Sequence, residues 1–203
     1  MYVFTGTVVG LRFKEGVVLA SDSRATAYYL VLSKRLKKIF RLGDQIGGGF
    51  TGSPGDVQSL VSLLRAEARL YQVTYGRPIS VRSLTQVASN YLSGRRIFPM
   101  LVDGMIAGVD ADGPHLFFID AIGGKIEESK FASSGSGATV AYGVLERSYR
   151  EEMSREEGVK LAGLAIKTAI ERDAATGDGL AIAVIDGEGY RELSDEEIHR
   201  LGI

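Results

Sequence analysis

Cysteine is absent from this chain of 203 residues, and histidine occurs only at positions 115 and 199. Without cysteine the chain can form no disulfide, no thiolate metal site and no cysteine nucleophile. A Ser-His-Asp or Cys-His mechanism needs a histidine oriented by an acidic group. Neither His115 nor His199 is expected to have such a partner, so these mechanisms are not expected.

The chain also has no large excess of either positive or negative charge, and it has no long apolar run. The net charge is -1, so no overall field attracts nucleic acid or an anionic membrane. The basic run at 34–38 could bind nucleic acid, but such a run is more often a solvated face. No apolar stretch is long enough to span a bilayer. We therefore expect neither nucleic acid nor membrane as a partner, and neither a cofactor nor a metal.

The length and composition fit one large domain with an ample core. Hydrophobic residues make up 45% of the chain, and the mean hydropathy is +0.06. Residues 1–6 lack the regions of a signal peptide. They are interpreted as a frayed terminus or as a short leader that is cut off, followed by a single domain at 7–203.

Periodicity predicts strands, then two helices, then strands, then two helices, then strands. Strands are expected at 7–13, 17–22, 28–31, 39–42, 45–51, 101–109, 115–121, 130–133 and 180–185. Helices are expected from Ser53 to Gly76, from Ser80 to Gly94, over 138–149, over 154–172 and after Ser194. This order predicts an α+β fold, a four-layer αββα sandwich of two antiparallel sheets flanked by helix pairs.

The pair Gly6-Thr7 suggests a nucleophile that needs no histidine. A threonine hydroxyl is a poor nucleophile until a base takes its proton. If cleavage after Gly6 made Thr7 the first residue, its own α-amino group, with a pKa of about 7.7–8.0, would be that base. Thr7 is therefore the candidate nucleophile.

Other residues could complete such a site. A lysine such as Lys38 lowers the pKa of the hydroxyl, and an aspartate such as Asp22 keeps that lysine charged. A backbone donor at Gly52 could stabilise the tetrahedral intermediate, and Ser136 with Asp173 could surround the amine. Singly, each feature has a plainer explanation, such as a surface lysine or a simple turn. Their common order is what favours a site.

Seven stretches carry a specific resemblance. They are GVVLASDSRAT (16–26), SK with KKI (33–34 and 37–39), TGSPGD (51–56), GMIAGV (104–109), IDAIGG (119–124), GSG with AYGVLE (135–137 and 141–146) and RDAATGDG (172–179). In this order they resemble a β-type subunit of the archaeal proteasome, an N-terminal-nucleophile hydrolase. The similarity runs from about Thr7 to the C-terminus.

The resemblance implies a threonine endopeptidase that is activated by autocatalytic cleavage of a zymogen. Asp22 and Lys38 would then activate the nucleophile, and Gly52 would be the oxyanion donor. Ser136, Asp173 and Thr176 match the shell around the terminal amine, with Thr176 where the family commonly has serine. The substrate pocket would have Phe50 as its floor and Ala25 and Leu36 as walls.

The same resemblance implies a cytoplasmic particle that degrades unfolded polypeptides in a closed chamber. The partners would be α-type subunits and other β-type subunits in stacked seven-membered rings. A regulatory ATPase would act through the α ring. A small-molecule amidase of the same type and the shorter bacterial relative of the proteasome are less favoured alternatives.

Two features depart from the active pattern. Thr7 precedes Gly16 by nine positions instead of ten, and a count back from Asp22 without a gap reaches Gly6, which has no side chain. Phe50 would shrink the substrate pocket. Two hypotheses follow. Either Thr7 is the nucleophile and one residue is deleted near the strand start, or the chain is a non-catalytic, ring-building subunit that assembles with a second, catalytic β subunit.

Overall fold

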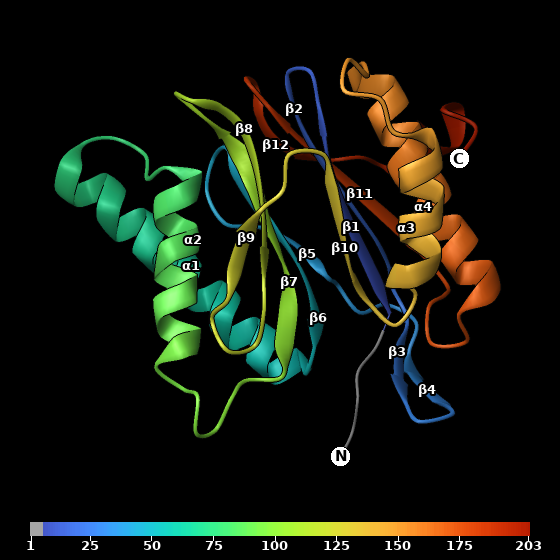
Figure 1. The fold of residues 1–203 in the computed structure, drawn as a ribbon, viewed down its shortest axis with the longest axis horizontal. Helices are drawn as coiled ribbons and strands as arrows, with labels where there is room; N and C mark the ends of the chain where they lie inside the picture. Colours follow the sequence, from blue (N-terminus) through green and yellow to red (C-terminus); the bar gives the residue numbers. More distant parts are fainter. Residues whose placement is uncertain (1–5) are drawn as a thin grey trace.

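The computed structural model describes residues 6–203. Two five-stranded antiparallel sheets pack face to face, and a pair of helices covers the outer face of each (Figure 1). The strand orders are β10-β1-β2-β11-β12 and β5-β6-β7-β8-β9, and β3-β4 forms a separate hairpin. The predicted four-layer αββα sandwich is confirmed.

The first sheet carries the N-terminal strand. Its strands are β1 (Thr7–Phe13), β2 (Gly16–Asp22), β10 (Phe131–Gly135), β11 (Leu180–Asp186) and β12 (Gly189–Glu192). Helices α3 (Ala138–Ser148) and α4 (Arg155–Arg172) cover it, and the short α5 (Asp195–Arg200) lies near the C-terminus.

The second sheet lies beneath the other helix pair. Its strands are β5 (Ile39–Arg41), β6 (Ile46–Gly52), β7 (Val102–Asp110), β8 (Gly113–Ile119) and β9 (Lys125–Glu127). Helices α1 (Pro54–Tyr75) and α2 (Val81–Ser93) cover it, and the separate hairpin consists of β3 (Ala25–Ala27) and β4 (Leu30–Ser33).

Successive side chains of β1 point to opposite faces of the first sheet, and this determines the surroundings of positions 6 and 7. Val9 and Leu11 pack in the cluster of the first sheet with α3 and α4. Val8 packs between the two sheets, and a Cβ on Gly10 would meet Met105 of the second sheet. Because successive side chains point to opposite faces, Thr7 shares the helix-covered face and position 6 shares the face between the sheets.

Most predicted elements agree with the structure, including the capping boxes at Ser154 and Ser194. One strand pairing was wrong, and strands β3, β9 and β12 were not among the expected strands. Strand 39–42 was placed next to strand 28–31, but β5 pairs with β6, and β4 pairs with β3. Strand β9 was missed, because three exposed residues show no apolar alternation. Among the described residues, no helix is both long and apolar enough to cross a membrane.

Candidate active site

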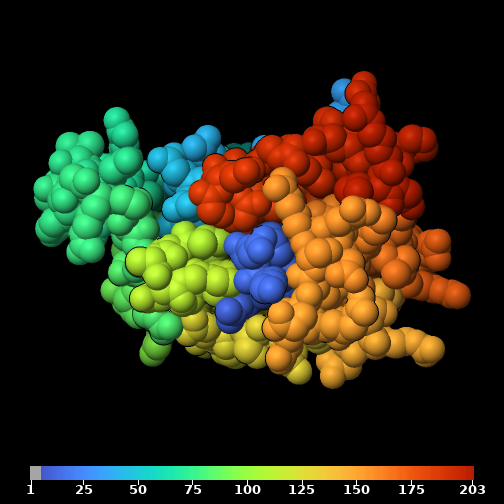
Figure 2. All heavy atoms as spheres, turned by 90° about the horizontal axis from the view of Figure 1, so that it is seen from above, coloured from blue at the N-terminus to red at the C-terminus, as the bar shows by residue number. Residues whose placement is uncertain are grey.

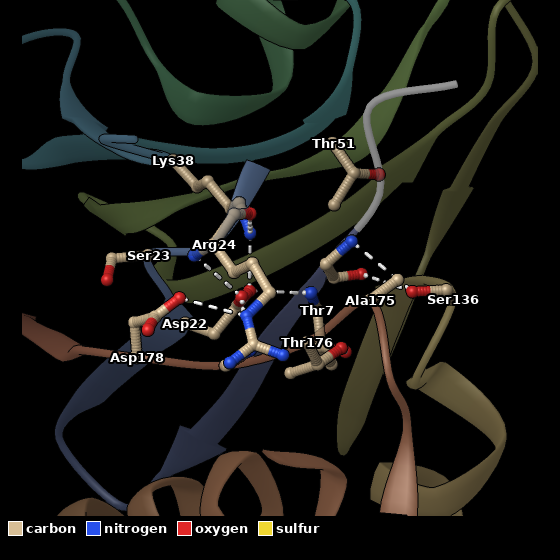
Figure 3. A network of polar contacts seen from close by, with 12 residues as sticks. Thr7, Asp22, Ser23, Arg24, Lys38, Thr51, Ser136, Ala175, Thr176 and Asp178 are labelled. Atoms are coloured by element: carbon tan, nitrogen blue, oxygen red, sulfur yellow. Dashed lines mark hydrogen bonds and ion pairs between the residues drawn. The ribbon is translucent and has the colours of Figure 1, made fainter. Parts of the chain in front are cut away.

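Asp22 is the buried centre of a polar network at one end of the first sheet (Figure 3). Its Oδ1 accepts hydrogen bonds from Lys38 Nζ at 2.5 Å and from the Thr7 amide at 2.8 Å. Its Oδ2 accepts from the amides of Arg24 at 3.0 Å and Gly177 at 2.9 Å. Four donors thus replace the water that a buried carboxylate loses.

Lys38 lies directly before β5, and only 3% of its surface is exposed. Its ammonium donates to Asp22 and, at 2.8 Å, to the carbonyl oxygen of Arg24. Burial lowers the pKa of Lys38, although the charge of Asp22 opposes this effect. The predicted couple of Asp22 and Lys38 is therefore assembled, and both side chains are buried.

Gly6 faces this couple from the start of the described chain. A Cβ built on Gly6 would lie only 1.8 Å from Lys38 Nζ and 2.7 Å from Asp22 Oδ1. The residue has a φ of +130°, which L side chains rarely adopt. Its amide donates to Ser136 Oγ at 3.3 Å, and its carbonyl accepts from the Ser136 amide at 2.9 Å. Residue 6, and not residue 7, is therefore the residue next to the Lys38 ammonium.

The Thr7 hydroxyl lies on the other face of β1. Thr7 is fully buried, and its Oγ1 is 2.7 Å from Thr176 Oγ1. Thr176 in turn donates to Asp173 Oδ2 at 2.5 Å, so the Thr7 hydroxyl is the donor to Thr176. Figure 3 shows the Thr7 side chain directed toward Thr176 and away from Lys38.

The residues expected to surround a terminal amine, Ser136, Asp173 and Thr176, also lie together. They do so next to Gly6. Ser136 Oγ donates to Asp173 Oδ2 at 2.5 Å, and the same Ser136 holds the backbone of Gly6. Thr176 joins through Asp173. The Thr7 hydroxyl is directed to Thr176 and away from Lys38, which agrees with the gap-free count that ended at Gly6.

A cavity of about 280 Å³ opens beside the network. Leu36, Lys38, Phe50 and Gly52 line it, whereas Ala25 is not among its lining residues. Ala25 is buried and pairs with Ser33 inside the β3-β4 hairpin. Phe50 is 1% exposed and packs into the core beneath α1 and α2, so it closes the inner end of the cavity.

Gly52 ends β6 in a conformation with φ of +117°. A Cβ there would come within 2.0 Å of the Leu101 carbonyl oxygen, so the strand can reach α1 along this path only with glycine. The backbone at Gly52 therefore forms part of the cavity wall.

Sequence reasoning missed Arg24 as a member of the site. Its Nε donates to Asp178 Oδ2 at 2.9 Å, and its Nη1 donates to the Ala174 carbonyl at 2.9 Å. These contacts fix the turn after α4 that carries Thr176. Arg24 and Asp178 both lie within the stretches that carry the resemblance, so the signal was present, but their pairing requires the fold.

The histidine expectation needs a correction. His115 was expected to lack an acidic partner, but its Nδ1 lies 2.8 Å from Glu127 Oε1 and its Nε2 lies 3.2 Å from Asp110 Oδ1. Glu127 lies on β9, the strand that was not predicted. This cluster contains no hydroxyl partner among the contacts of the described residues, so it is not a serine-type triad.

Comparison with known proteins agrees with this architecture. A sequence profile described as "Proteasome subunit" matches residues 3–185. The chain belongs to the proteasome subunit family. It is 47% identical to "Proteasome subunit beta" of Methanocaldococcus vulcanius over 196 residues, which cover 96% of this chain and 88% of that protein.

Two further archaeal relatives have the same extent of similarity. "Proteasome subunit beta" of Methanospirillum hungatei JF-1 is 46% identical over 95% of this chain and 92% of its own length. "Proteasome subunit beta 1" of Thermococcus onnurineus is 47% identical over 96% of this chain and 95% of its own. Membership of the proteasome β family supports a role in proteolysis and implies assembly with other proteasome subunits.

Proposed function

We propose that this chain is a ring-building β-type subunit of the proteasome core particle that lacks a nucleophile of its own. One observation carries the proposal: the residue that faces Lys38 and the amine shell is Gly6. Glycine has no hydroxyl, and no base can turn it into a nucleophile.

Thr7 does not fill this role in the observed register. Its hydroxyl donates to Thr176 within the buried layer beneath α3 and α4. A slip of β1 by one residue would bring this hydroxyl to Lys38, but it would also turn every side chain of the strand to the opposite face. The slip would move Val9 and Leu11 out of the core that they share with those helices. The packing of β1 therefore argues against Thr7 as the nucleophile.

In this proposal the particle contains α-type subunits and a second, catalytic β subunit in stacked seven-membered rings. Unfolded polypeptides would be cut by that second subunit, after a regulatory ATPase delivers them through the α ring in the cytoplasm. The domain that enters the ring is 7–203. No cleavage between Gly6 and Thr7 is required for its role; residues 1–5 lie outside the described structure.

A threonine endopeptidase with Thr7 as its nucleophile is the second candidate. The intact couple of Asp22 and Lys38 favours it, because a buried ion pair is costly to maintain without a function. Ring assembly offers another reason for the couple, since it fixes the backbone at Thr7 and Arg24.

Co-assembly separates the two candidates. This chain is combined with α-type subunits and a catalytic β subunit, and peptide hydrolysis is measured after alanine replaces the threonine nucleophile of one β chain at a time. We expect alanine in the partner β subunit to abolish hydrolysis and Thr7→Ala in this chain to leave it unchanged. A loss of hydrolysis in the Thr7→Ala particle, with assembly intact, overturns the proposal in favour of the endopeptidase.

A further inference from the structure

A second polar cluster lies at the end of the sandwich opposite Gly6, where β7 turns into β8 (Figure 1). Asp110 ends β7, Asp112 lies in the turn, and His115 lies on β8. One ligand atom from each side chain lies within 4.8 Å of the others. Figure 2 shows this turn, in yellow-green, at the surface beside the blue turn between β1 and β2.

The histidine of this cluster has one ring nitrogen engaged and one unengaged. Its Nδ1 is 2.8 Å from Glu127 Oε1. Because a carboxylate can only accept, Nδ1 carries the hydrogen. The Nε2 atom is buried and has no hydrogen bond among the described residues, although Asp110 Oδ1 lies 3.2 Å away. The residue as a whole is 9% exposed.

A neutral imidazole would therefore place an unprotonated nitrogen 3.2 Å from a carboxylate oxygen. Two acceptors in this arrangement repel each other unless a cation lies between them, and an unpaired polar atom in a buried place is itself costly. The Asp110 carboxylate cannot easily turn away, because its Oδ2 accepts from the amide of Val81, the first residue of α2, at 2.9 Å.

The geometry points to a binding site for a divalent transition-metal ion, of the zinc class, held by His115 Nε2 and the carboxylates of Asp110 and Asp112. An imidazole nitrogen with two carboxylates suits zinc better than magnesium or calcium, which prefer oxygen alone. Glu127 takes the place of the outer carboxylate that orients most metal-binding histidines. Three protein ligands leave one position for water.

The charges around His115 are also compatible with a bound divalent cation. Two carboxylates balance the two positive charges of the ion, and Arg82 is directed to Glu127, with its Nη2 2.7 Å from Oε2. Through Asp110 the ion would join the β7-β8 turn to the start of α2.

Calorimetric titration of the full-length chain with Zn²⁺ at neutral pH tests the site. We expect one ion per chain with the wild type. Asp112→Asn should weaken binding at least tenfold; Asp112 is exposed, so this change leaves the fold intact. Glu127→Gln should weaken binding by about ten- to a hundredfold. His199→Gln and Asp195→Asn change an exposed histidine and an exposed aspartate elsewhere, and they should leave it unchanged.

Three results would overturn the inference. The first is the absence of saturable binding to the wild type, and the second is binding that Asp112→Asn does not weaken. The third is a nitrogen NMR spectrum in which His115 Nε2 carries a proton at neutral pH and keeps it when Zn²⁺ is added. In that case a proton, and not a metal ion, bridges His115 and Asp110.

Discussion

The ammonium of Lys38 lies where the side chain of residue 6 would begin, since a Cβ on Gly6 would be 1.8 Å from Nζ. No real Cβ tolerates such a contact, so the lysine has extended into space that a larger residue would need. The couple of Lys38 and Asp22 is therefore adapted to glycine at this position. This relationship has consequences for stability and for activity.

Gly6→Ala should destabilise the full-length chain. Alanine would adopt a φ of +130° only with strain, of about 1–3 kcal/mol, and it would push Lys38 away from Asp22. At about 2–4 °C per kcal/mol for a chain of this size, the melting temperature should fall by several degrees. Gly55→Ala is the control, because it lies in α1 with open space around it. Equal melting temperatures of Gly6→Ala and wild type would contradict this account.

Gly6→Thr with residues 1–5 removed should create a nucleophile. The new terminal amine would lie beside Ser136, which now holds the Gly6 amide. A first residue has no φ restraint, so its Cβ can turn out of the 1.8 Å contact with Lys38 Nζ that it would make within the longer chain. Loss of the nucleophile lowers kcat by about 10⁶ in a well-studied serine protease, so even incomplete restoration should be measurable as peptide hydrolysis by the assembled particle. A matched truncation that keeps Gly6 should stay inactive. Hydrolysis by both particles, or by neither, would contradict the prediction.

Asp22→Asn should cost more stability than Lys38→Met. Asparagine leaves the buried ammonium unpaired, which costs about 3–5 kcal/mol, and it disturbs three backbone amides as well. Methionine removes the charge and leaves Asp22 with those three donors. Chemical unfolding should also show that the double variant loses less than the sum of the single losses. The reverse order of the two single variants would show that the ammonium, and not the carboxylate, organises the site.

How far sequence reasoning reached is clearest at β1. The apolar pattern of 7–13 predicted the strand, and the common order of Asp22, Lys38 and Ser136 predicted their meeting. The face of β1 on which the Thr7 side chain lies could not be predicted, because a one-residue deletion near the strand start, after Thr7, would reverse it. Only the packing of Val8 between the sheets and of Val9 beneath the helices determines the register. The contact between His115 and Glu127 could not be predicted either, because Glu127 lies on β9, whose three exposed residues show no apolar pattern.

Glu197→Gln should change how stability depends on pH. The amide of Ser194 and the guanidinium of Arg191 lower the pKa of Glu197 from 4.5 to about 2. Because the folded pKa is below the unfolded value, this stabilisation is complete above about pH 4.5 and is lost as the pH falls from there toward 2. The melting temperature of wild type should exceed that of Glu197→Gln at pH 7, and the difference should vanish near pH 2. Glu188→Gln, at a side chain that is 89% exposed, is the control. A constant difference across this range would contradict the assignment.

The rate of peptide hydrolysis by a particle with this chain as its only β-type subunit tests the central claim most directly. Because Gly6 and not Thr7 faces Lys38, we predict no hydrolysis above that of α-type rings alone. Hydrolysis that Thr7→Ala abolishes, in a particle that still assembles, would contradict the claim and identify Thr7 as the nucleophile.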